Sequence, residues 1–181
     1  MSNSPVVVEP CDLPELTLLR VRYPDFVRFA YFRDAYRTRL TSTSASPVEI
    51  FQSVFAHRPT WLKIVLMARN SLALLIGLDA PTVSEIMKPE MKSHYAVGEK
   101  IGPWPIFVLT DTELVAGRDN KHLDFRLSVS RETGGETAST IVSTVCRVHN
   151  AFGKVCLFFI IPFHKWGVRR LIMSAALAGR L

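Results

Sequence analysis

The chain has 181 residues, of which 48% are hydrophobic and 21% are charged. This length suits one domain with a buried core, and the composition excludes a wholly disordered chain. The net charge of +6 favours anionic partners. Residues 1–10 lack a basic start followed by a long apolar run, so we expect a cytoplasmic protein without a secretory signal.

The first forty residues predict a leader followed by a strand. Prolines at positions 5, 10 and 14 indicate an extended or flexible leader over residues 1–18, which leaves 19–181 as a single domain. Aromatic and β-favouring residues then predict an exposed or edge strand at Phe32–Leu40. Arginines crowd the 20–39 segment, which is therefore a candidate basic patch.

Two helices are expected next. Ser46 suits an N-cap and Pro47 a first helical position, so a short helix should run from Pro47 to about Ala56. A second helix is expected over residues 60–76, and an irregular connection over 79–95.

The second half of the chain predicts strands and then a long helix. Short polar breaks separate four β-favouring runs and suit consecutive hairpins, at residues 105–110, 113–117, 121–131 and 139–149. A kinked helix is expected over 152–178, interrupted by Pro162 and Gly167. Its apolar run from Val155 to Phe163 is too short to span a membrane, which favours a buried helix. The fold class is therefore α+β, with an antiparallel sheet packed around the C-terminal helix.

Polar residues alternate along the 121–131 strand and therefore share one face, namely His122, Asp124, Arg126, Ser128 and Ser130. In one interpretation, His122 and Asp124 form an acid/base pair and Arg126 orients an anionic group. In the other, this is the solvated face of a sheet, with Asp124 and Arg126 paired across to a neighbouring strand.

Four further residues are candidates for ligand binding. A hairpin around residues 134–135 would bring Arg147 and His149 close to Asp124, although a one-residue change of register would separate them. His164 lies inside the apolar helix, where it either faces a cavity or is a structural residue. Trp104, between two prolines, is either an aromatic wall of a cavity or part of the core.

The motifs of the common nucleotide-binding, serine-hydrolase and zinc sites are absent from the sequence. The five histidines are dispersed, and the three cysteines form no Cys-x-x-Cys pair, which favours reduced thiols. We therefore expect neither a metal nor another cofactor.

Three segments carry a resemblance to a known family, namely Gly117–Val129, Val148–Lys154 and Pro162–His164. They resemble a family of bacterial domains of unknown function that is similar to the helix-grip, START-like superfamily. The resemblance covers roughly residues 32–175. It implies an antiparallel sheet gripping the C-terminal helix, two short helices closing one end, and an apolar cavity between sheet and helix. The superfamily usually has more than the five strands expected here, so either residues 92–100 supply another or the sheet is truncated.

Three hypotheses for function follow. The first is binding of a small hydrophobic or amphipathic ligand between the sheet and the C-terminal helix, anchored by the candidate residues. The second is an enzyme resembling the superfamily's cyclases and hydratases, with His122 or His149 as general base and Asp124 as its partner. The third is a weak contact of the basic 20–39 segment with an anionic membrane surface, without specific binding to nucleic acid. The sequence leaves the oligomeric state open.

Overall fold

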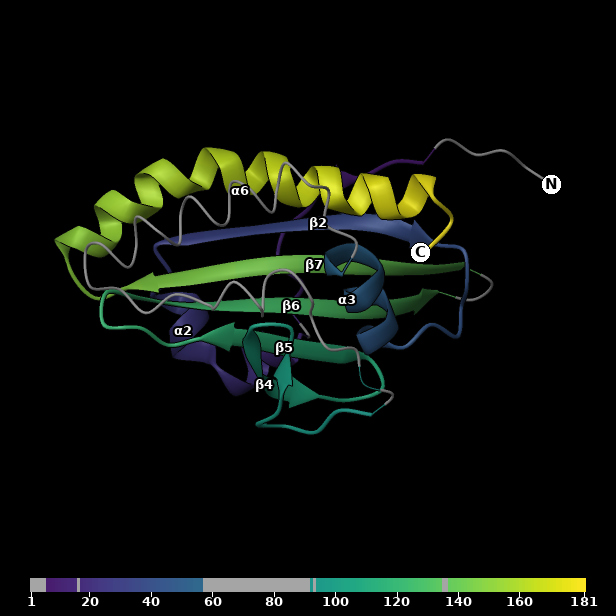
Figure 1. Cartoon of the computed structure of the whole chain (residues 1–181), viewed down its shortest axis with the longest axis horizontal. Coiled ribbons are helices and arrows are strands. Elements are labelled where there is room, and N and C mark those ends of the chain that lie inside the picture. The colour runs from purple at the N-terminus through teal and green to yellow at the C-terminus, as the bar shows by residue number, and fades with distance from the viewer. Residues whose placement is uncertain (1–5, 16, 57–91, 93, 135–136) are drawn as a thin grey trace.

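The computed structural model of the chain describes residues 6–15, 17–56, 92, 94–134 and 137–181. Over these residues the chain forms an antiparallel sheet with a 27-residue helix along one face (Figure 1). The elements in chain order are β1 (Glu9–Pro10), α1 (Leu18–Arg22), α2 (Pro24–Arg28), β2 (Phe32–Leu40), α3 (Pro47–Phe55), β3 (Lys100–Ile101), β4 (Trp104–Leu109), β5 (Glu113–Arg118), β6 (Leu123–Gly134), β7 (Thr137–Val148) and α6 (Ala151–Leu177). The predicted α+β class is confirmed.

The seven described strands are ordered β1-β2-β7-β6-β5-β4-β3. Strands β4 to β7 form the consecutive hairpins that the sequence predicts, and β2 pairs with β7 along its whole length. The expected count of about five strands was too low. The two extra strands, β1 and β3, have two residues each and carry no sequence periodicity. The expected helix over 60–76 and most of the 79–95 connection lie outside the described residues.

Helices cover both faces of the sheet (Figure 1). On one face, α3 and α6 bury a large apolar core that includes Tyr36, Leu127 and Ile172. On the opposite face, α1, α2 and the segment before them bury a smaller core, which includes Phe26 and Val145. A polar side chain on either face can therefore be buried.

The first residues of helix α3 explain why the helix begins where it does. Ser46 accepts a hydrogen bond from the Glu49 backbone N–H, and the Glu49 carboxylate accepts one from the Ser46 backbone N–H. This reciprocal capping satisfies free amides at the helix start, and Pro47 needs no such partner. The same contacts with Ser46 lower the pKa of the Glu49 carboxyl. The predicted helix start is confirmed.

The segment before α1 is extended and packed against the sheet. Val8 and Leu13 are buried, and Glu9 and Pro10 pair with Arg37 and Tyr36 of β2. We expected an extended or flexible leader over residues 1–18, and its described part is extended and supplies an edge strand and core side chains.

Helix α6 begins after Asn150, whose side chain accepts a hydrogen bond from the Gly153 backbone N–H at 3.0 Å. Its sheet-facing side is buried at Leu157, Val168 and Leu171. Its opposite side is exposed, so the expectation of a buried helix holds for one side only. By length and mean hydropathy (1.2) α6 could also span a membrane. This is weak evidence for a membrane span, because the inner side of α6 packs on the sheet.

Candidate functional site

The alternating polar residues of β6 face away from α6. Arg126 lies directly opposite Val145 and Gly117 on the neighbouring strands, and Val145 belongs to the core under α1 and α2. Because directly opposed residues share a face, Asp124 and Arg126 point to the α2 side of the sheet. They do not line the space between the sheet and α6.

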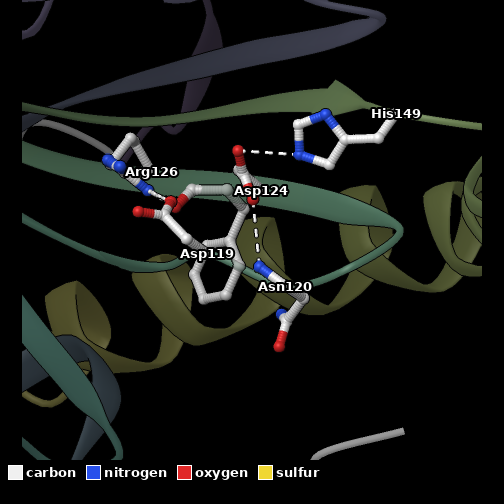
Figure 2. Close-up of polar contacts among 6 residues, drawn as sticks. Asp119, Asn120, Asp124, Arg126 and His149 are labelled. Carbon is white, nitrogen blue, oxygen red and sulfur yellow. Dashed lines mark hydrogen bonds and ion pairs between the residues drawn. The ribbon is translucent and has the colours of Figure 1, made fainter.

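Arg126 is only 5% exposed and is held by aromatic rings. Its guanidinium lies 3.7 Å from the ring centroid of Phe107, 4.9 Å from that of Phe26 and 5.9 Å from that of Tyr23. It also donates to the Asp119 carboxylate at 2.5 Å (Figure 2). The ring contacts, the ion pair and the low exposure favour a structural role for Arg126.

Asp124 pairs with His149 and not with His122 (Figure 2). Its carboxylate oxygens lie 2.8 Å from His149 Nε2 and 3.0 Å from the Asn120 backbone N–H. Arg147 lies opposite Asp124 in the β6–β7 register, as the hairpin predicts. The Asp124 carboxylate thus connects Asn120, in the turn before β6, with His149, directly after β7.

His122 precedes β6 and lies at the start of α6. Its Nδ1 is 2.9 Å from Asn150 Nδ2, and its ring centroid is 4.8 Å from that of Phe152. The side chains of His122 and His149 therefore make different contacts, although the His149 backbone N–H donates to the His122 carbonyl at 2.9 Å.

The other polar residues of this face are also bound within the protein. Ser128 donates to the buried Glu113 carboxylate at 2.6 Å, and Ser130 donates to the Ile141 carbonyl at 3.4 Å. Ser128 and Ser130 are both buried. This part of the face is not solvated, and the Glu113 carboxylate joins it to α1. Two buried atoms of the same face have no hydrogen-bond partner among the described residues, namely Arg126 Nε and Ser143 Oγ.

A second polar cluster lies under α6, and sequence reasoning found only one of its members. His164, on the sheet-facing side of α6, has Nε2 3.4 Å from Asp34 Oδ1 of β2. The Asp34 side chain is 9% exposed and that of His164 is 21% exposed. Thr144 of β7 lies directly opposite Asp34 and is also buried. We refer to Asp34, Thr144 and His164 as the α6 cluster.

Two atoms of the α6 cluster have no hydrogen-bond partner among the described residues. They are Asp34 Oδ2 and Thr144 Oγ1. Leaving a buried polar atom unpaired costs about 1–3 kcal/mol, and most such atoms in proteins are paired. A ligand donating to Asp34 and exchanging a hydrogen bond with Thr144 would remove this cost.

Apolar and weakly polar groups surround the α6 cluster. The Phe32 ring meets the His164 ring edge-on with centroids 5.6 Å apart, and Leu127 lies opposite Thr144 on β6. Burial, the negative charge of Asp34 and a hydrogen bond with the Asp34 side chain raise the pKa of the Tyr36 phenol. The cluster is thus a polar end within an apolar setting, where a buried ligand gains most from each hydrogen bond.

Trp104 packs on the α3 side of the core. Its ring makes edge-on contacts with Phe51, Phe55 and Phe125, at centroid distances of 5.9, 6.2 and 5.9 Å. It is partly buried against the core. Of the two sequence interpretations, these contacts favour a core residue.

No three His, Cys, Asp or Glu side chains in the described parts of the chain are grouped so that they could hold a metal ion.

Cys146, which lies opposite Phe32 in the β2–β7 pairing, predicts a pH dependence of stability. Burial, with a smaller effect of the Asp34 charge, raises the pKa of its thiol from 9.0 to about 12. Above pH 9.0 the unfolded chain loses this proton before the native chain does, so stability falls as the pH rises. Urea unfolding between about pH 9 and 11 should therefore show a steeper decline for wild type than for Cys146→Ala, by up to roughly 1 kcal/mol per pH unit. Equal slopes would contradict this assignment.

A family model for proteins of unknown function, DUF2867, matches residues 26–171. The chain belongs to this family. The DUF2867 match runs from α2 into α6 and includes all three residues of the α6 cluster. No curated protein and no solved structure matches the chain.

Proposed function

We propose that this DUF2867 protein binds a small amphipathic molecule between its sheet and α6, with the polar end of the ligand at the α6 cluster. The observation that supports this most is that two directly opposed residues beside His164 each have a buried polar atom without a partner among the described residues, namely Asp34 Oδ2 and Thr144 Oγ1. The resemblance to the helix-grip, START-like superfamily supports the same location. The polar residues proposed to anchor the ligand lie on β2, β7 and α6, whereas the sequence hypothesis placed the first of them on β6.

The α6 cluster sets the chemistry of the ligand. A carboxylate oxygen accepts hydrogen bonds and does not donate them, so Asp34 calls for a hydroxyl, amine or amide N–H on the ligand. The Thr144 hydroxyl can donate or accept. The neighbouring Phe32 ring and Leu127 favour an apolar remainder.

A second candidate function is catalysis in the same place. His164 and Asp34 have the arrangement of a general base held by a carboxylate, which the enzymatic hypothesis had assigned to His122 or His149 with Asp124. The Asp34–His164 pair is more enclosed than the Asp124–His149 pair, whose histidine side chain is 35% exposed. Chemical change of a bound molecule by wild type, lost in His164→Gln with binding retained, would favour the enzyme.

The proposed function predicts a preference for ligands that donate a hydrogen bond. Decanol and decyl methyl ether share an apolar chain, but only decanol has an O–H. We expect wild type to bind decanol about tenfold more tightly, the equivalent of one hydrogen bond to a charged acceptor. Asp34→Val should abolish this preference, as measured by competition with a fluorescent fatty-alcohol probe. Native mass spectrometry of freshly purified protein would additionally identify a molecule retained from the cell.

Asp124→Val is the matched control, because it removes a carboxylate from the other face of the sheet. It should leave the decanol preference intact and should lower stability, since both Asp124 oxygens have partners. Asp34→Val should also lower stability, because it leaves His164 without its carboxylate partner, so the decanol preference is the property that distinguishes the two variants. An undiminished preference in Asp34→Val would refute the proposed anchor.

A further inference from the structure

The outward side of α6 is an exposed apolar surface. Phe158, Phe159 and Phe163 are 70%, 65% and 71% exposed. Val155 and Trp166 are more than half exposed as well. Exposed aromatic side chains in one continuous patch mark an interaction surface more often than isolated ones do. We call these five residues the outer α6 face.

Spacing along the helix places this face opposite the sheet. Val155, Phe159, Phe163 and Trp166 follow each other at intervals of four, four and three residues, which aligns them along one side of a helix. The buried residue Leu157 and the cluster residue His164 lie on the other side. The outer α6 face is therefore separate from the proposed ligand site.

Positive charge accompanies the aromatic residues. Helix α6 contains Lys154, Lys165, Arg169 and Arg170 but neither aspartate nor glutamate. All four cationic residues are exposed, and the Arg170 guanidinium lies 5.5 Å from the Trp166 ring centroid. Aromatic rings beside lysine and arginine are the composition of helices that lie in the headgroup region of anionic bilayers.

We propose that the outer α6 face binds the surface of a membrane rich in anionic phospholipid, with α6 parallel to the bilayer. Phenylalanine and tryptophan side chains enter the headgroup region, and the lysines and arginines contact lipid phosphates. The helix lies on the bilayer without crossing it, because its inner side packs on the sheet at Val168 and Leu171.

Charge distinguishes this partner from a second copy of the chain. In a two-fold dimer through the outer α6 face, identical surfaces would meet, and the cations of α6 would face one another without acids on either helix. An anionic bilayer complements the same charges. Charge complementarity therefore favours lipid.

The structure also separates this surface from the basic 20–39 segment. Arg33 and Arg39 are exposed and alternate with Asp34 on β2, so their side chains point away from α6. Arg37 on the same side pairs with Glu132 at 2.9 Å. The two basic surfaces lie on opposite faces of the sheet and can be tested independently.

Co-sedimentation with phosphatidylserine-containing vesicles tests the proposal. Wild type should bind these vesicles at low salt, bind phosphatidylcholine vesicles weakly, and be released by high salt. Phe159→Ser/Phe163→Ser should weaken binding by roughly tenfold or more, because two aromatic side chains no longer enter the bilayer. Both side chains are largely exposed, so the variant should fold, as circular dichroism will show.

Matched charge variants then locate the surface. Lys154→Glu/Arg170→Glu and Arg33→Glu/Arg39→Glu change the net charge equally, but on opposite faces. We expect the first to lose at least about tenfold in vesicle binding and the second to lose much less, since each cation near the surface contributes about 1 kcal/mol. Equal losses, or loss only in the β2 variant, would overturn the proposal. So would absence of wild-type binding, or a solution dimer that Phe159→Ser/Phe163→Ser converts to monomer.

Discussion

Arg126→Ala should lower the free energy of unfolding by about 3 kcal/mol, because it removes a buried stem and a desolvated cation that contacts aromatic rings. The guanidinium is closest to Phe107, and it also lies over Phe26 and Tyr23, which belong to α2 and its boundary. Its loss would open a space between α2 and the sheet. Denaturant unfolding followed by tryptophan fluorescence measures this cost.

Two further substitutions separate the contributions of the apolar stem and of the positive charge to this loss of stability. Arg126→Met keeps the length and apolar stem without the charge, so it should cost less than alanine. Arg126→Lys keeps the charge, but its ammonium cannot lie flat on the Phe107 ring, so it should fall between wild type and alanine. If Arg126→Ala left stability unchanged but reduced decanol binding, Arg126 would be a ligand anchor, as the sequence had suggested.

The elements with local signals could be predicted from the sequence. The bounds of β2 agree with the predicted Phe32–Leu40, and α3 begins at Pro47, because β-favouring residues and an N-cap act within a few positions. The strands β1 and β3 could not be predicted. Two residues have no measurable period, and their pairing depends on neighbours that are distant in sequence, such as Glu9 with Arg37.

The orientation of β6 was the missing fact for the site. Alternation correctly placed Asp124 and Arg126 on one face, but it does not say which face turns toward the long helix. Helices cover both faces of this sheet, so burial does not decide the question either. The strand register opposite Val145 and the packing of Phe26 and Phe107 around Arg126 place the polar face on the α2 side.

The position of Asp34 along its strand indicates a buried carboxylate, which the positive charge of the segment as a whole does not show. In the sequence, Asp34 lies within the arginine-rich 20–39 segment, which we interpreted as a candidate basic patch. On a strand, however, Arg33, Arg37 and Arg39 fall on one side, whereas Asp34 and Tyr36 fall on the other with Leu40. A carboxylate sharing the apolar side of a strand is a candidate buried charge, and such groups are uncommon without a partner or a function. This pattern could have identified Asp34 beside His164.

Glu113→Ala should also cost about 3 kcal/mol, because three hydrogen-bond donors would lose one buried acceptor. The carboxylate accepts from the backbone N–H groups of Leu18 and Leu19 at the start of α1, and from the Ser128 hydroxyl. Glu113 is 3% exposed, so water cannot readily replace it. Helix α1 has only five residues and cannot form stably without such contacts.

The loss should be concentrated at α1, which distinguishes it from a general weakening of the core. Hydrogen exchange should accelerate at Leu19 and its neighbours in Glu113→Ala, while the amides of the β6–β7 pair remain protected. Ser128→Ala removes one of the three donors and should cost about 1 kcal/mol, and the double variant should cost less than the sum of the two. Additive losses would mean that Glu113 and Ser128 act independently. Glu113 would then hold α1 through the Leu18 and Leu19 amides without support from Ser128.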